Sequence, residues 1–179
     1  CQNGLVWLYE NGIGVSKSKG KAIGWYKLAA EQNHKQAQFN LGLFFLKDKS
    51  LDDNYQTAIK WFTLAAQQGV LEAQYNLGTI YFDGFGVVQN FKKAFANYLL
   101  SAEKGFEMSQ YKLSLMFLNG WGTKADNIKA FMWANIAASK NHEKAIIKRD
   151  ELLKILSSKD VQRGQELSLA CFEKKLKNC

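Results

Sequence analysis

Apolar and small residues recur along this chain at helical spacing, in segments of about a dozen residues. Within 73–82 these positions are Ala73, Leu77, Gly78 and Tyr81, which share one face of a helix. Gly84 and Gly86 then interrupt the pattern, because glycine reaches backbone angles that other residues avoid. A second apolar stripe starts at about Phe91 and ends at Gly105. The segment predicts a helix, a glycine loop, a second helix and a short turn.

This pattern repeats every 36 residues, four times, with no insertion or deletion. Equivalent positions include Leu5, Leu41, Leu77 and Leu113; Ala22, Ala58, Ala94 and Ala130; and Ala30, Ala66, Ala102 and Ala138. A fixed period of this length is typical of a solenoid, in which one helical unit stacks on copies of itself. We therefore predict an all-α fold with four repeats, at 1–36, 37–72, 73–108 and 109–144.

Residues 145–179 leave the repeat pattern and predict a C-terminal pair of capping helices. The first is expected over Lys144–Leu156, and the second is capped by Ser157 or Ser158 and runs to about Lys175. A polar terminal unit of this kind keeps the end of a solenoid soluble. Within the repeats, Trp25, Trp61 and Trp133 are predicted to fill the space between helices that approach closely at the alanines.

The formal charge of +8, from 24 Lys and Arg against 16 Asp and Glu, raises the question of an anionic partner. The basic residues are interspersed with acidic ones, which favours a solvated lysine-rich surface. An anion-binding surface protein stays open as an alternative, and nucleic acid is a weaker one. No apolar run is long enough to span a membrane.

The repeat resembles the Sel-one-like repeat family, a relative of the tetratricopeptide repeats. The motif is read in Leu77-Gly78-Thr-Ile-Tyr81-Phe-Asp-Gly84-Phe-Gly86-Val87, in Lys21-Ala22-Ile-Gly-Trp25-Tyr26 and in Ala65-Ala66-Gln-Gln-Gly69, and the resemblance covers residues 1–144. It implies a right-handed α-α superhelix that serves as a scaffold or adaptor in protein complexes. Bacterial members are often exported, which implies a periplasmic or secreted protein whose signal peptide lies outside this sequence.

By analogy with tetratricopeptide repeats, the first helix of each repeat lines a concave surface. Residues two before and two after the repeat leucines then form an aromatic and aliphatic ladder for a protein or peptide partner. We call this set the ladder; it consists of Trp7, Phe39, Leu43, Tyr75, Thr79, Tyr111 and Leu115. Packing between helices is the alternative role for these side chains. The recurring Gln2, Gln38, Gln74 and Gln110 are interpreted as solvated helix positions.

Catalytic and metal sites find little support. Ser16–Lys19 and Ser101–Lys104 have the Ser-x-x-Lys spacing of a penicillin-interacting enzyme, but neither Ser-Asp-Asn nor Lys-Thr-Gly accompanies them. His34 and His142 are three repeats apart and cannot share a metal ion, because packed helices are about 8–10 Å apart. We therefore predict a non-catalytic scaffold without metal or cofactor, with the penicillin-interacting enzyme as the alternative.

Two cysteines near the C-terminus, Cys171 and Cys179, are eight residues apart. In one unbroken helix their Cα atoms would be about 12 Å apart, whereas a disulfide needs less than about 7 Å. Pairing therefore requires the helix to end near Lys175–Lys177 and the chain to fold back. Cysteines so spaced resemble pairs at a helix–turn boundary in exported relatives, and this resemblance predicts a Cys171–Cys179 bridge in an oxidising compartment. Two reduced thiols are the alternative.

Overall fold

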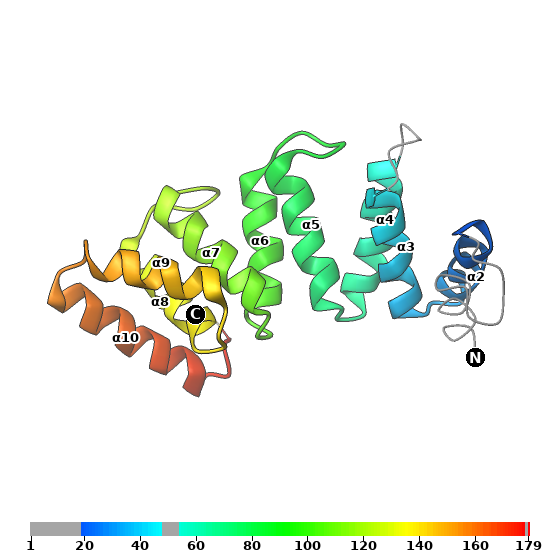
Figure 1. Cartoon of the computed structure of the whole chain (residues 1–179). Helices are drawn as coiled ribbons and strands as arrows, with labels where there is room; N and C mark the ends of the chain where they lie inside the picture. Colours follow the sequence, from blue (N-terminus) through cyan, green and yellow to red (C-terminus); the bar gives the residue numbers. More distant parts are fainter. Residues whose placement is uncertain (1–18, 48–53, 178) are drawn as a thin grey trace. The chain divides into compact units, whose positions relative to one another are not determined.

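The computed structural model describes residues 19–47, 54–177 and 179, which form α-helices and no strands (Figure 1). The helices are α2 (Lys19–Glu31), α3 (Lys35–Lys47), α4 (Asn54–Gln67), α5 (Leu71–Asp83), α6 (Phe91–Ala102), α7 (Glu107–Asn119), α8 (Asn127–Ala138), α9 (Glu143–Leu153) and α10 (Ser158–Glu173). The all-α prediction is confirmed. The expected start of the second helix of the third repeat at Phe91 is also where α6 begins.

The chain divides into two compact units. The described part of the first comprises residues 19–47, 54–73 and 85–87, and so contains α2, α3 and α4. The second comprises 74–84 and the described residues from 88 onward, and contains most of α5 together with α6 to α10. The short segment Phe85–Val87 therefore belongs to the first unit, although it lies between α5 and α6 in the sequence.

Within each unit, paired helices approach closely where the first helix carries a glycine. A Cβ atom placed on Gly42 would lie 2.6 Å from the Phe62 ring, and one on Gly78 would lie 2.7 Å from the Tyr98 ring. Both distances are too short for real atoms, so the aromatic ring occupies the space that a side chain would need. In the fourth repeat the equivalent residues are Ser114 and Ala134, both fully buried. A bulkier residue on one helix thus accompanies a smaller one on its partner.

Helix α8 forms the centre of the second unit and packs against α7, α9 and α10. Its fully or nearly fully buried residues are Ala130, Phe131, Met132, Trp133, Ala134, Ile136, Ala137 and Ala138. A helix buried on nearly all sides needs apolar residues around its whole circumference, which this sequence provides. Trp133 is completely buried, as its predicted space-filling role requires.

Gln38, Gln74 and Gln110 are buried, so their interpretation as solvated positions is wrong; Gln2 lies outside the described residues. Gln38 and Gln110 are 2% and 0% exposed. The side-chain amide of Gln38 donates to the Ala30 carbonyl at 3.2 Å, and that of Gln110 donates to the equivalent Ala102 carbonyl at 3.1 Å. Each glutamine thereby adds a second donor to an end-of-helix carbonyl of the preceding repeat, which also accepts the backbone N–H of Asn33 or Gly105.

The two described glycine loops each stack an aromatic residue on a residue of the preceding repeat. Phe85 stacks on Tyr55 with ring centroids 5.6 Å apart, and the equivalent Trp121 stacks on Phe91 at 6.1 Å. The glycine after each loop aromatic has a positive φ, 65° at Gly86 and 72° at Gly122. Trp121 is half-buried, and its ring also lies against Phe82 with centroids 5.2 Å apart. The loops at 12–14 and 48–53 lie outside the described residues.

The C-terminal helices form as expected, but their surface is only partly polar. Ser157 caps α10 by accepting a hydrogen bond from the Asp160 backbone N–H, and Gly164, Ser168 and Cys171 are the buried residues of this helix. Gly164 lies against Phe131 of α8. The large apolar residues that α9, α10 and the turn between them expose are Ile147, Leu153, Ile155, Leu169 and Phe172. That this pair serves as a cap stays a prediction.

The predicted disulfide joins Cys171 to Cys179, whose Cα atoms are 5.3 Å apart. The chain turns back immediately after α10, through residues Lys174–Lys177, which we call the hook. The backbone N–H of Leu176 donates to the Cys171 carbonyl at 2.8 Å, and Lys175 and Leu176 both have positive φ. Leu176 and Cys179 pack against the core of the second unit, so the hook is part of the folded structure.

Candidate binding surface

The described ladder residues lie on the first helices of successive repeats. Phe39 and Leu43 are on α3 in the first unit, and Tyr75, Thr79, Tyr111 and Leu115 are on α5 and α7 in the second. All six are half-buried. Trp7 lies outside the described residues. Each ladder side chain therefore has both a packed and a solvent-facing part.

The described ladder aromatics each contact another ring from a following helix or turn. Phe39 lies against Phe62 with ring centroids 5.9 Å apart. Tyr75 contacts both Tyr98 and Phe106, each at 5.6 Å. Inter-helix packing accounts for the buried part of these rings, and a partner would meet the remainder.

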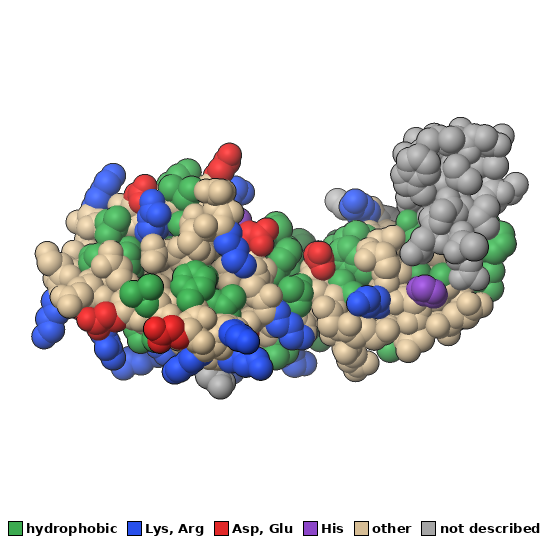
Figure 2. All heavy atoms as spheres, turned by 90° about the horizontal axis from the view of Figure 1, so that it is seen from below, with side chains coloured by type: hydrophobic (Ala, Val, Ile, Leu, Met, Phe, Trp, Pro, Cys, Tyr) green, Lys and Arg blue, Asp and Glu red, His purple; other side chains and the backbone are tan. Residues whose placement is uncertain are grey.

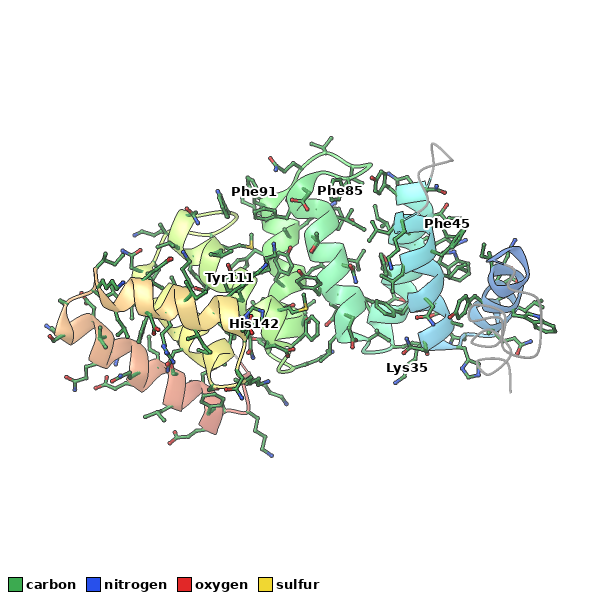
Figure 3. All side chains as sticks on the ribbon, in the orientation of Figure 1. Lys35, Phe45, Phe85, Phe91, Tyr111 and His142 are labelled. Carbon is green, nitrogen blue, oxygen red and sulfur yellow. A yellow bond between two sulfur atoms is a disulfide. The ribbon has the colours of Figure 1, made fainter. Side chains whose placement is uncertain are left out.

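Tyr111 has a different ring partner, His142, because the residue equivalent to Phe62 and Tyr98 is Ala134. The two rings stack with centroids 5.1 Å apart (Figure 3). His142 also caps α9, since its Nδ1 accepts a hydrogen bond from the Ala145 backbone N–H at 3.2 Å. The sequence prediction did not give His142 this role. It could have been found from the spacing, because His142 follows Tyr111 by 31 residues and Phe106 follows Tyr75 by the same number.

Thr79 of the ladder is hydrogen-bonded to Tyr98, a buried tyrosine of the second unit. The hydroxyl groups of Thr79 and Tyr98 are hydrogen-bonded at 3.0 Å, and Thr79 also donates to the Tyr75 carbonyl. Burial raises the pKa of the Tyr98 hydroxyl strongly, against the smaller opposing effect of the hydrogen bond to Thr79. The pKa of Tyr75 is raised for the same reason. Both phenols are held in their neutral form, which a packed aromatic requires.

These shifts predict a loss of stability in alkali. A tyrosine in the unfolded chain has a pKa of about 10, and a raised pKa in the fold means that the folded state holds its proton more tightly. The contribution of these two tyrosines to the free energy of unfolding should therefore be constant below about pH 10 and fall above it. Urea midpoints measured across this range should decline less steeply in Tyr98→Phe than in the parent protein. Equal slopes would contradict the assignment.

The candidate serine–lysine pair in the described residues is unsuited to acyl transfer. Ser101 is 0% exposed within α6, so a substrate has no access to its hydroxyl. Ser16 lies outside the described residues. In the described part of the chain, no group of three or more His, Cys, Asp or Glu side chains is placed to bind a metal. A search of the same residues finds no helix that could cross a membrane.

Paired helices of constant period, with close approaches at small residues and loops stacked on the preceding repeat, define an α-solenoid repeat protein. Comparison with known families narrows this class. The profile of the Sel1 repeat matches residues 2–34, 35–70, 71–106 and 108–142, which is most of the chain. The chain therefore belongs to the Sel1 repeat family, whose members generally act as protein-interaction scaffolds.

Solved structures show the same fold. A protective antigen present in uropathogenic Escherichia coli strains, which displays the SLR fold, matches 98% of this chain with a TM-score of 0.87 and 31% identity. A Sel1 repeat protein from Oxalobacter formigenes matches 84% of it with a TM-score of 0.78 and 33% identity. These matches confirm the solenoid prediction. They cover 38% and 62% of those two chains, respectively.

A curated relative is a putative sel1-like repeat-containing protein of Acanthamoeba polyphaga mimivirus. It is 46% identical over 44 residues, which are 25% of this chain and 8% of the relative. The chain thus spans a small part of that protein, and the similarity amounts to little more than one repeat.

Proposed function

We propose that this chain is a non-catalytic scaffold or adaptor that binds a protein or peptide partner through the ladder. The observation that carries the proposal is the recurrence of a half-buried tyrosine at the same position of two successive first helices, Tyr75 and Tyr111. Their rings are already held by neighbouring aromatics, so little side-chain freedom is lost on binding. An extended peptide or a helix laid across the repeats would meet one such ring in each.

We also propose that the protein works in the bacterial envelope or outside the cell. The Cys171–Cys179 disulfide supports this location, because disulfides persist in oxidising compartments and are rare in the cytosol. The similarity to a protective antigen of uropathogenic Escherichia coli is consistent with it.

A crosslinking experiment tests the ladder. A photo-activated crosslinking residue is placed at Leu115, in the ladder on α7, and as a matched control at Leu100, which is 50% exposed on α6. In the native host, we expect adducts of defined mass from position 115 and none from position 100. Leu115→Lys should also reduce recovery of the same partner at least ten-fold, whereas Leu100→Lys should leave it unchanged.

Two results would count against the proposal. Equal adducts from both positions, or none from either, would show that the ladder is not a contact surface. Acylation of the chain by a labelled β-lactam, abolished by Ser16→Ala, would instead favour a penicillin-interacting enzyme.

A further inference from the structure

The hook brings together lysines that are far apart in the sequence. Lys174, Lys175 and Lys177 belong to the hook itself. A Cβ atom built on Gly105, in the turn after α6, would have Lys140 Nζ at 3.0 Å and Leu176 Cδ1 at 3.7 Å as its neighbours. Lys140 also donates to the Gly105 carbonyl, and Lys104 immediately precedes this glycine. The turns after α6 and α8 therefore meet the hook at Gly105, and each of the three segments carries at least one lysine.

These lysines are exposed and add to a positive edge. The structure leaves Lys104, Lys140, Lys174, Lys175 and Lys177 exposed. In the described part of the chain, the ion pairs join Lys148 to Glu151, Arg149 to Asp150 and Arg163 to Glu166, and none of them includes one of the five. Figure 2 shows lysine and arginine side chains gathered along the lower edge of the second unit. Glu173 is the acidic residue adjoining the hook.

Two exposed apolar side chains belong to the end of α10, the helix that leads into the hook. Leu169 and Phe172, on the last two turns of α10, are 65% and 42% exposed. The Phe172 carbonyl accepts a hydrogen bond from the Lys175 backbone N–H, so the hook begins directly at the last turn of α10. Apolar side chains next to several lysines are typical of segments that lie at a membrane surface, where the lysines meet headgroups and the apolar groups enter the acyl boundary.

We propose that the hook and the last turns of α10 form a docking site for a bilayer surface that carries anionic lipid headgroups. The five cationic residues are all lysines, which suit diffuse attraction to headgroups, whereas nucleic-acid recognition favours the planar, bidentate guanidinium of arginine. Leu169 and Phe172 also favour a bilayer over a soluble polyanion, because a soluble polyanion offers no apolar phase for them. The disulfide closes the hook, in which Leu176 lies near Lys140 at the Gly105 turn.

The site is built from α10 and the turns after α6 and α8. Those two turns also hold Phe106 and His142, the ring partners of Tyr75 and Tyr111, so the proposed docking site adjoins the ladder. A protein with both would hold its partner at a bilayer surface. The proposal does not depend on the ladder being a binding surface.

Vesicle flotation with the full, oxidised chain tests the proposal. Vesicles contain phosphatidylcholine alone or phosphatidylcholine mixed with phosphatidylglycerol, and binding is expected only to the mixed vesicles. Each lysine near an anionic surface contributes about a five-fold gain in partitioning, so Lys174→Gln with Lys177→Gln should reduce binding about 25-fold. The matched control is Lys154→Gln with Lys159→Gln, which removes two charges at the other end of α10, about 24 Å away. It should change binding less than two-fold.

Two further variants distinguish binding through a specific docking site from binding through net positive charge alone. Lys140→Gln should lower binding about five-fold although it is remote from the hook in sequence. After reduction of the disulfide, which leaves the net charge unchanged, that effect should disappear. Phe172→Ser should also weaken binding to the mixed vesicles, and circular dichroism checks that each variant is folded.

Several results would overturn the proposal. Equal losses in the hook and control pairs would show that net charge alone is responsible. Binding to neutral vesicles would remove the role of the lysines. Binding to double-stranded DNA that is tighter than to mixed vesicles and unaffected by Phe172→Ser would assign the surface to nucleic acid instead.

Discussion

Replacing Gly122 with alanine is expected to lower the free energy of unfolding by about 2–4 kcal/mol. Gly122 has a φ of 72°, where any residue with a Cβ is strained, and a Cβ there would lie 2.2 Å from the Phe91 carbonyl oxygen. Backbone cannot move aside as a flexible side chain can. The loop would have to withdraw from α6, which would also break the stacking of Trp121 on Phe91. Urea denaturation followed by tryptophan fluorescence measures the loss.

The same loop supplies the control. Gly120 also has a positive φ, 69°, but a Cβ there would have its nearest neighbour at 3.4 Å, the backbone N of Ala125. Gly120→Ala therefore adds backbone strain with little crowding and should cost about 1–2 kcal/mol. If the two alanine variants were equally stable, the contact between the loop and the start of α6 would not contribute to stability.

Truncation of Trp133 to alanine is expected to cost about 3–5 kcal/mol. The side chain is completely buried in α8, and its removal leaves a cavity that helices packed on several sides cannot fill by relaxing. Thermal and urea unfolding of the variant should both show the loss. Trp25, at the equivalent position of the first repeat, is half-buried, and Trp25→Ala should cost markedly less.

A phenylalanine variant separates volume from hydrogen bonding. Among the described residues, the Trp133 indole N–H has no hydrogen-bond partner. Trp133→Phe thus loses volume but no hydrogen bond, and it should retain most of the stability that the alanine variant loses. A phenylalanine variant as unstable as the alanine variant would indicate that the indole N–H is satisfied in solution.

Periodicity predicted the helices well, because each one buries a face whose spacing is visible in the sequence. Phe91 and Ser157 were both identified as helix boundaries, and the alanines of the repeat are buried where described, apart from the half-buried Ala66. The disulfide needed the family resemblance as well as spacing. The eight-residue spacing alone showed only that Cys171 and Cys179 can pair if the helix ends before Cys179.

The misjudged glutamines show what a repeat pattern leaves out. A polar residue recurring in register looks the same in sequence whether it meets water or a carbonyl. The partner of Gln110 is the carbonyl of Ala102 at the end of a preceding helix, and no side-chain pattern marks it. The stacking of His142 on Tyr111 depends on a helix and a turn that meet only in the folded chain. The exposure of Leu169 and Phe172 is likewise set by which face of α10 lies on α8.

The size matching between paired helices determines how this chain can be recombined. Gly42 with Phe62, and Gly78 with Tyr98, are pairs in which both members lie within one repeat, as do Ser114 and Ala134 in the fourth. Moving a single helix between the third and fourth repeats would place Ser114 against Tyr98 in one product and open a gap between Gly78 and Ala134 in the other. Moving both helices together would keep each pair intact. The two-helix repeat is therefore the smallest segment that can be duplicated or exchanged without repacking its own interior.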